Sequence, residues 1–354
     1  MTDTVLLDGS YGEGGGQIVR TALGLSALTG RPLRIEHIRA GRSKPGLRPQ
    51  HLAVVRAMAR ICDAHLRGDQ VGSRSLSFEP GASPKAGEYI FDIPKMAGTA
   101  SAGSVTLLFQ ALFPPLALAK GVSTLRLAGG THVRWSPPFH YLAEVYLRAM
   151  ERVGFRAHLE LDQWGWYPRG GGQMVAVVEG LGPNPTSLSP LRLCDRGRLT
   201  EVWGISAASN LPDHIRQRQR DRAQARLRAR HIKANIELVD APSPGPGTAL
   251  FLLAEYEHLS AGFTGYGRIR YPAEKVADDA VQAFEDHRRS RAALDPHLAD
   301  QVLLPLALVP GPSAYTTSRV TRHLLTNRWV IQHFIEREIR VEGQEGSHGQ
   351  VTIA

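Results

Sequence analysis

A glycine-dense segment near the start of the chain holds the first residues whose types and spacing could do chemistry. Residues 8–20 read D-G-S-Y-G-E-G-G-G-Q-I-V-R, after an apolar β-prone run at 5–7 and before apolar residues at helical spacing that stop at Gly30. The segment is therefore predicted to join a strand to a helix. Glycine permits positive φ and close approach to backbone N–H groups, and a helix N-terminus adds partial positive charge. We expect this loop to bind phosphate.

Glu13 lies among these glycines, where its charge would repel a phosphate unless a cation came between them. Mg²⁺ is usually held by one or two carboxylates together with substrate phosphate oxygens, so Glu13 is a candidate ligand for a divalent cation. The loop matches neither common nucleotide fingerprint, because no Gly-Lys-Ser/Thr follows and Gln17 stands where a last glycine would be needed. A tight strand-to-helix turn without a ligand is the alternative in a chain with 36 glycines.

A second loop, residues 39–51, concentrates positive charge. Arg39, Arg42, Lys44 and Arg48 fall within ten residues of a Gly/Pro-shaped segment between a predicted strand and helix. These cations repel one another unless an anion lies between them, and arginines on rigid flanks can clamp phosphoryl groups. A solvated surface turn is the alternative.

Two further polar residues stand at informative positions. Gln110 interrupts an otherwise apolar helix, where a buried amide needs either backbone or ligand partners. His323 opens a predicted helix over 322–335, with Thr321 as its N-cap. An imidazole near a helix N-terminus tends to stay neutral, which keeps a nucleophilic nitrogen available. Taken alone, each residue also fits a purely structural role.

The elements that must position these residues alternate between strand-like and helix-like over residues 1 to about 185, which predicts a mixture of α and β structure. Strands at 157–161 and 174–178 are expected to pair around a Gly-rich turn. That turn, residues 167–175, echoes residues 11–19 at a distance of 156 residues and hints at internal duplication. The remaining segments of this half are 33–38, 50–65, 103–118, 124–127 and 141–153.

A Pro/Ser/Gly-rich stretch at 180–190 marks a predicted boundary. We expect a discontinuous catalytic core, residues 1–190 and 290–354, and a smaller inserted α/β module at 191–289. The module would hold a strand at 199–207, a basic helix at 213–230, a Pro/Gly linker at 241–247, a strand at 249–256 and a helix at 273–289. The core would then resume with segments at 298–308, 322–335, 338–341 and 350–353.

Composition bounds the class of protein. The 354 residues are 42% hydrophobic and 21% charged, as in an ordinary soluble protein, and no leader or membrane span is evident, so a cytoplasmic location is expected. Cys62 and Cys194 lack CxxC spacing and signal neither a disulfide framework nor a zinc site. The net charge is +9, of which +6 falls in residues 213–233. That basic helix either follows an RNA backbone or is simply solvated.

Four motifs in the same order along the whole length resemble those of RNA 3′-terminal phosphate cyclases. They are D-G…G-E-G-G-G-Q…R at 8–20, R-A-G-R…K-P-G-L…Q-H at 39–51, G…P…G-G-G at 165–172 and H-L-L-T-N at 323–327. The resemblance implies repeated βαβ-type units, shared with enolpyruvyl transferases, and an inserted α/β module. It implies a cytoplasmic ligase-type enzyme of RNA processing. Its cofactors would be ATP and a divalent cation (Mg or Mn), and its partner would be an RNA with a 3′-phosphate end. No membrane partner is expected, and the resemblance implies no particular oligomeric state.

The resemblance also implies a mechanism. His323 would attack the α-phosphate of ATP and carry AMP on its imidazole, the RNA 3′-phosphate would take the AMP, and the neighbouring 2′-hydroxyl would close a 2′,3′-cyclic phosphate with loss of AMP. Arg20, Arg39 and Arg42 would clamp phosphates and Glu13 would hold the metal. The nucleotide would be bound by Gln110, Pro137, Gln50, His51 and the segment His297, Leu298, Ala299, Asp300 and Gln301.

The sequence departs from the family pattern at two of these positions. His297 stands where a tyrosine is usual, and Trp164 replaces a basic residue at the start of the second Gly-rich turn. Two other classes compete with the enzyme: a non-catalytic cyclase-like scaffold of ribosome biogenesis, which lacks the histidine, and an enolpyruvyl transferase. The presence of His323 within its flanking motif, together with Glu13 and the arginines, favours the cyclase.

Overall fold

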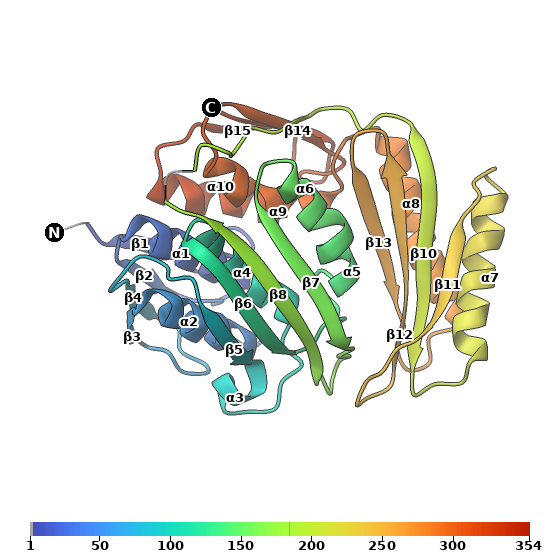
Figure 1. The fold of residues 1–354 in the computed structure, drawn as a ribbon, viewed down its shortest axis with the longest axis horizontal. Helices are drawn as coiled ribbons and strands as arrows, with labels where there is room; N and C mark the ends of the chain where they lie inside the picture. The colour runs from blue at the N-terminus through green and yellow to red at the C-terminus, as the bar shows by residue number, and fades with distance from the viewer. Residues whose placement is uncertain (1–2, 184) are drawn as a thin grey trace.

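Four four-stranded sheets and the helices that connect their strands form the computed structural model, which describes residues 3–183 and 185–354 (Figure 1). Residues 1, 2 and 184 lie outside the described residues. Residue 184 falls within the predicted boundary at 180–190, and the structure describes the other residues of that boundary. The mixed α/β class predicted from the sequence is confirmed. No helix in the described part of the chain is long and apolar enough to cross a membrane.

Three of the sheets repeat one topology, in which a strand, helical connection and parallel strand are followed by a second helical connection and two antiparallel strands. In the first unit the strands lie in the order β1-β2-β4-β3, with β1 parallel to β2 and the other pairs antiparallel. Its elements are β1 (Val5–Asp8), α1 (Gly16–Thr29), β2 (Leu33–Glu36), α2 (Pro49–Cys62), β3 (His65–Arg67) and β4 (Leu76–Glu79).

The second unit has the same order and directions, β5-β6-β8-β7. Its β7 and β8 pair antiparallel with Ala157 opposite Val178, as predicted, and a π-helical segment, η1, replaces part of the predicted helix at 141–153. The elements are β5 (Glu88–Asp92), α3 (Ile93–Ala97), α4 (Val105–Ala117), β6 (Lys120–Gly129), α5 (Phe139–Tyr141), η1 (Leu142–Leu147), α6 (Arg148–Glu151), β7 (Arg156–Gln163) and β8 (Gly172–Leu181).

The third unit is interrupted, because its first strand and first helix are separated by about a hundred residues of chain. Its strand order is β9-β14-β16-β15, with β9 parallel to β14. The elements are β9 (Arg192–Leu193), α9 (Pro296–Ala307), β14 (Ser313–Thr317), α10 (Arg322–Phe334), β15 (Ile339–Glu342) and β16 (Gly349–Ile353). The predicted repetition of βαβ-type units is therefore visible in the topology.

Between β9 and α9 the chain forms the fourth sheet, of order β11-β10-β12-β13, with its own cluster of buried apolar residues. Figure 1 shows this sheet and its two helices at one end of the molecule. Its elements are β10 (Leu199–Ser209), α7 (His214–Arg228), β11 (Asn235–Asp240), β12 (Gly247–Tyr256), β13 (Ser260–Tyr266) and α8 (Ala273–Ser290). The domain limits at 191 and 289 remain a prediction, and β9 pairs within the third unit although it follows residue 191.

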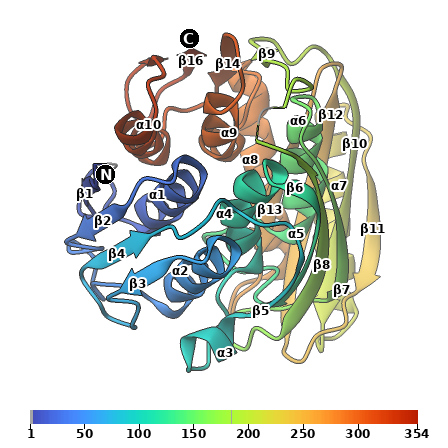
Figure 2. The same ribbon diagram turned by 60° about the vertical axis from the view of Figure 1, so that its left-hand side comes forward.

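The helices of the three repeated units pack together between the sheets, and α1 contacts α2, α4 and α10 (Figure 2). Local signals set several of their ends: Gly30 ends α1 with a φ of 68°, and the Thr321 hydroxyl accepts a hydrogen bond from Leu324 N–H at the start of α10. This packing brings helix N-termini from the first and third units toward one another.

The duplication inferred from the two glycine triads needs correction. The first triad precedes α1, whereas the second lies in the turn between β7 and β8. The equivalent of the second triad in the first unit is the β3–β4 turn, so the two triads occupy different places in the repeat. Repetition exists in the fold, but this sequence echo does not mark it.

Candidate active site

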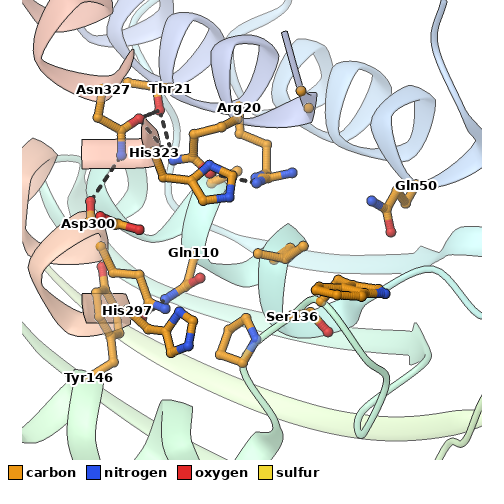
Figure 3. Close-up of a pocket in the computed structure, with 18 of the residues that line it drawn as sticks. Arg20, Thr21, Gln50, Gln110, Ser136, Tyr146, His297, Asp300, His323 and Asn327 are labelled. Atoms are coloured by element: carbon orange, nitrogen blue, oxygen red, sulfur yellow. Dashed lines mark hydrogen bonds between the residues drawn. The ribbon is translucent and has the colours of Figure 1, made fainter. Parts of the chain in front are cut away.

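A cavity of about 630 Å³ lies where the helices of the three repeated units meet (Figure 3). Its walls come from the N-terminal ends of α1, α2, α9 and α10, the middle of α4, the loop at 135–138 and strand β13. Twelve of the fourteen residues predicted to be catalytic or nucleotide-binding line it: Glu13, Arg20, Arg39, Arg42, Gln50, His51, Gln110, Pro137, His297, Asp300, Gln301 and His323.

The glycine loop delivers its carboxylate and backbone to this cavity. Gly12 and Gly14 adopt φ values of 58° and 57°, which strain other residues, and α1 begins at Gly16 without a side-chain cap at Gly15. A Cβ on Gly16 would come within 2.1 Å of His51 Nε2, so the close approach of α1 to α2 requires glycine there. The open N-terminus of α1 thus faces the cavity, as the phosphate-binding prediction requires.

Glu13 connects the two residue types that the chemistry needs. One carboxylate oxygen lies 2.5 Å from His323 Nδ1, and the other accepts a hydrogen bond from Arg42. Burial acts to raise the pKa of Glu13, but the contacts with His323 and Arg42 outweigh it and lower the pKa to about 2. Glu13 is therefore ionised at neutral pH and holds His323 through Nδ1, which directs Nε2 away from the carboxylate.

The arginines gather in the cavity with little acidic compensation. Arg20 donates to Gln17, and burial lowers its pKa to about 10 despite nearby Glu13. Arg39 donates to the backbone carbonyls of Lys44 and Gly46; burial, followed by the charges of Arg42 and Arg48, lowers its pKa. Four arginines face two carboxyl groups, Glu13 and Asp300, among the described residues that line the cavity. The site is therefore suited to polyphosphate anions.

The predicted nucleotide residues divide into two groups. Gln110 Nε2 donates to Gln301 Oε1 at 2.7 Å, which joins α4 to α9, and both side chains line the cavity beside His297. Leu298 and Ala299 belong instead to the hydrophobic core and do not line the cavity. Their place in the motif is explained by packing, because they fix the helix turn that presents the neighbouring polar residues.

Asp300 combines burial with a place on the cavity wall. Its carboxylate accepts a hydrogen bond from the Thr321 hydroxyl, and burial raises its pKa to about 7 although Thr321 and His323 act in the opposite direction. Burial thus favours the neutral form of Asp300, which can donate as well as accept hydrogen bonds.

Gln50 and His51 lie at the start of α2. His51 is buried, and its Nδ1 accepts from the Arg48 N–H at 3.1 Å. Burial, with Arg20, Arg39 and Arg48 nearby, lowers the pKa of His51 well below its ordinary value. His51 is therefore a neutral hydrogen-bonding group rather than an additional cation.

Sequence reasoning assigned no role to several residues that hold the site together. Buried Asn327 accepts from Thr21 Oγ1 at 2.8 Å and from Gln17 Nε2 at 2.9 Å, and it donates to the Asp300 carbonyl at 3.0 Å (Figure 3). It thereby joins α10, α1 and α9 around His323. Its spacing of four residues from His323 places both on one face of a helix, which is the signal that could have found it.

Two sequence features lie outside the cavity. The glycine turn at 170–172 does not line it; a Cβ on Gly171 would meet Pro244 at 2.6 Å, so this glycine allows contact with the linker before β12. Trp164, one of the two departures from the family pattern, is buried and stacks on His132 with ring centroids 3.9 Å apart. The second Gly-rich turn therefore serves packing.

The basic helix is also outside the cavity. Arg218, Arg222 and Arg226 of α7 form ion pairs with Glu274, Asp278 and Glu285 of α8. Strand β13 of the same sheet, rather than α7, supplies cavity-lining residues, namely Gly262, Thr264 and Tyr266. Sequence reasoning missed this wall, because nothing in β13 has an evident chemical motif.

Comparison with known proteins gives the family. The model of RNA 3′-terminal phosphate cyclases matches residues 11–341. Proteins named RNA 3′-terminal phosphate cyclase from Nostoc punctiforme and Methylococcus capsulatus are each 48% identical to this chain, covering 95% and 98% of it and 95% of each relative. One of the same name from Pyrococcus furiosus is 38% identical over 99% of the chain and 98% of its own length. The chain belongs to the RNA 3′-terminal phosphate cyclase family.

A solved structure gives a weaker likeness. The enolpyruvyl transferase NikO from Streptomyces tendae matches this chain with 12% identity and a TM-score of 0.29. The match covers all of this chain and 65% of the NikO chain. The family match over residues 11–341 is what separates this chain from the enolpyruvyl transferases considered above.

Proposed function

We propose that this chain uses ATP to convert the 3′-phosphate of an RNA into a 2′,3′-cyclic phosphate. Membership of the cyclase family supports the activity, and one observation carries its assignment to this cavity. That observation is the contact of Glu13 with His323 Nδ1 at 2.5 Å in a cavity lined by four arginines. Such a site holds a nucleophilic nitrogen among groups suited to phosphate.

In the first step His323 Nε2 attacks the α-phosphorus of ATP. The N–P bond forms as the bond to the pyrophosphate oxygen breaks, and AMP stays on the imidazole while pyrophosphate leaves. Glu13 orients the ring at Nδ1 and stabilises the positive charge that develops there. The Thr321 cap fixes the first turn of α10, so the ring is presented from a rigid element.

In the second step an oxygen of the RNA 3′-phosphate attacks the phosphorus of the bound AMP, and His323 leaves as a stable imidazole. The 3′-phosphate now carries AMP as a leaving group. The adjacent 2′-hydroxyl attacks the 3′-phosphorus, loses its proton, and displaces AMP to leave the cyclic ester. Arg20, Arg39 and Arg42 offset the charge that gathers on the phosphates in each step.

For the nucleotide we propose a place between α4, α9 and Pro137. Pro137 and His297 line the cavity beside the Gln110–Gln301 pair, so they can pack on adenine while the two amides meet polar edges of the nucleoside. Asp300 contributes a group that can donate or accept near neutral pH. Gln50 and His51 extend the same pocket on the α2 side.

We further propose that Glu13 contributes to binding a divalent cation. Glu13 is ionised and lines the cavity, and because its two oxygens already contact His323 and Arg42, an ion there would take most of its ligands from substrate phosphates. One carboxylate supplemented by phosphate oxygens is the arrangement typical of Mg²⁺. When bound, the cation would neutralise phosphate charge.

The experiment that tests this function is labelling with α-labelled ATP and Mg²⁺. We expect acid-labile label on the wild-type chain and none on His323→Ala, because a phosphoramidate is broken by acid. His333→Ala is a matched control, since His333 lies on the same helix and does not line the cavity. Absence of label on the wild type, or equal label on His323→Ala, would contradict the mechanism.

A further inference from the structure

Trp135 occupies an unusual position at the edge of the cavity. Its side chain is 94% exposed although it is the largest apolar side chain type, and its backbone φ is 66°. Positive φ is an outlier for a bulky residue; it costs free energy and persists only where the surrounding structure enforces it. Trp135 gains no burial in return. The position therefore combines two costs for which the packing of the chain offers no compensation.

The loop around Trp135 is fixed on both sides. Phe139 N–H donates to the Thr131 carbonyl at 3.1 Å, and the Thr106 hydroxyl donates to the Pro137 carbonyl at 2.7 Å. The Ser136 hydroxyl donates to the Val133 carbonyl at 2.8 Å. The indole is thus held outward by an ordered turn, which lowers the entropy cost of stacking a ligand on it.

The location identifies the chemistry of that ligand. Trp135 lines the same cavity as Arg39, Arg42 and Arg48, and the Arg134 guanidinium lies 5.8 Å from its ring centre. An exposed aromatic ring among cations is the arrangement that binds single-stranded nucleic acid, because bases stack on the ring while phosphates meet the charges. The Arg134 guanidinium lies over the ring, and Trp135 as a whole is 94% exposed to solvent.

We propose that Trp135 stacks on the base at the 3′-end of the RNA substrate. This inference rests on the proposed function, which requires an RNA end to enter the cavity while the rest of its chain stays outside. In Figure 3 Ser136, the neighbour of Trp135, lies on the side of the cavity away from Asp300 and His297. Adenine is assigned to the His297 side, so the exposed ring remains for the substrate that extends into solvent.

The test compares Trp135→Gly, Trp135→Phe and the wild type in binding to a short 3′-phosphorylated RNA without ATP. Glycine removes the ring and suits the positive φ, so the variant is expected to fold. We expect the Kd to rise about 5-fold to 150-fold in Trp135→Gly, the range of one lost base stack, and to recover largely in Trp135→Phe. Ile269→Gly is the matched control, because Ile269 is also 94% exposed but does not line the cavity.

A second substrate identifies the contact as stacking. The second substrate is the same RNA with an abasic ribose at its 3′-end. The wild type should bind this RNA more weakly than the intact RNA, whereas Trp135→Gly should bind the two RNAs equally well. Equal weakening of both RNAs by Trp135→Gly, or an unchanged Kd, would overturn the proposal. Loss of ATP-dependent labelling in Trp135→Gly would indicate that adenine stacks on the indole ring, and this result would also overturn the proposal. Failure of labelling in the wild type would count against the proposed function instead.

Discussion

Arginines serve opposite purposes in two regions of this protein. Three arginines of α7 pair with acids of α8: Arg218 forms a bidentate ion pair with Glu274, and Arg222 and Arg226 share Asp278. In the cavity Arg39 and Arg48 form no ion pair within the described part of the chain, and Arg42 shares Glu13 with His323. The segment that is most basic in the sequence is therefore the one in which Arg218, Arg222 and Arg226 pair with acidic side chains.

The difference teaches that local charge density is a poor guide to anion binding. Arg218, Arg222 and Arg226 recur every four residues along α7 and so form one stripe, which faces acidic residues of α8. The cavity arginines come from α1 and from the turn before α2, where Arg39 itself has a φ of 53°. Convergence of cations without acids requires an external anion, whereas pairing of cations with acids holds two helices together.

The largest effect should separate the two regions by activity. We expect Arg39→Gln to lower the rate of cyclic phosphate formation by roughly 100-fold to 1000-fold, the range seen when a group that stabilises transition-state charge is removed. Arg218→Gln should leave the rate within about two-fold, because neither Arg218 nor its partner Glu274 lines the cavity. Cyclic phosphate formation measured under saturating ATP is the assay. Equal losses in both variants would break the comparison.

A second test uses the opposite pKa shifts of two aspartates. Burial raises the pKa of Asp300 to about 7, so its contribution to stability is present below its ordinary pKa of 3.8 and is lost as pH rises through about 7. Asp278 on α8 is shifted down: burial opposes the shift, but Arg222 and Arg226 outweigh it, so its contribution is present above 3.8 and lost at acid pH.

Urea unfolding of Asp300→Asn and Asp278→Asn against the wild type measures these contributions. From about pH 4 to pH 8 the wild type should lose on the order of 3 to 4 kcal/mol relative to Asp300→Asn. Relative to Asp278→Asn it should instead gain stability as pH rises from acid to neutral. Slopes of the same sign in both pairs would contradict the assignment of the two environments.

A third, smaller effect sharpens the structural side of the comparison. Arg226 is largely buried and contacts both Asp278 and Glu285, whose side chain is 3% exposed. Arg226→Ala should lower the free energy of unfolding by about 1 to 2 kcal/mol. This is less than the loss expected when one member of an isolated buried ion pair is removed, because Glu285 still pairs with Arg230 and Arg289 in the variant. Arg198→Ala, which removes a highly exposed pair with Glu257, is the control and should change stability less than Arg226→Ala does.

Much of this arrangement could be predicted from the sequence because its signals are local. Helical spacing and Gly30 define α1, the Thr321 cap defines the start of α10, and each candidate site loop follows a strand and precedes a helix. The full-length family resemblance then joined loops that no local pattern could join. Twelve of the fourteen residues predicted for the site consequently line one cavity.

What failed depends on contacts between distant segments. The acids that neutralise Arg218 and Arg222 lie 56 residues further along the chain, so the charge of α7 alone could not reveal its partner. The third unit is split by the inserted sheet, so its repetition appears only in strand pairing. Leu298 and Ala299 share a motif with cavity residues, yet helix geometry turns them into the core.

The smallest effect is expected in RNA binding by α7. Because Arg218 and Arg222 already hold acids, replacing both with glutamine should leave the Kd for a 3′-phosphorylated RNA within about two-fold and its salt dependence unchanged. Arg48→Gln, which removes from the cavity a cation that forms no ion pair with any described residue, should weaken binding and reduce the slope of log K against log salt by about 1. If instead the α7 variant lowers the slope, the RNA must displace Glu274 and Asp278 from the arginines. In that case the α7 arginines would bind RNA once their ion pairs with α8 opened. The two regions would then differ in how strongly they bind RNA rather than in whether they bind it.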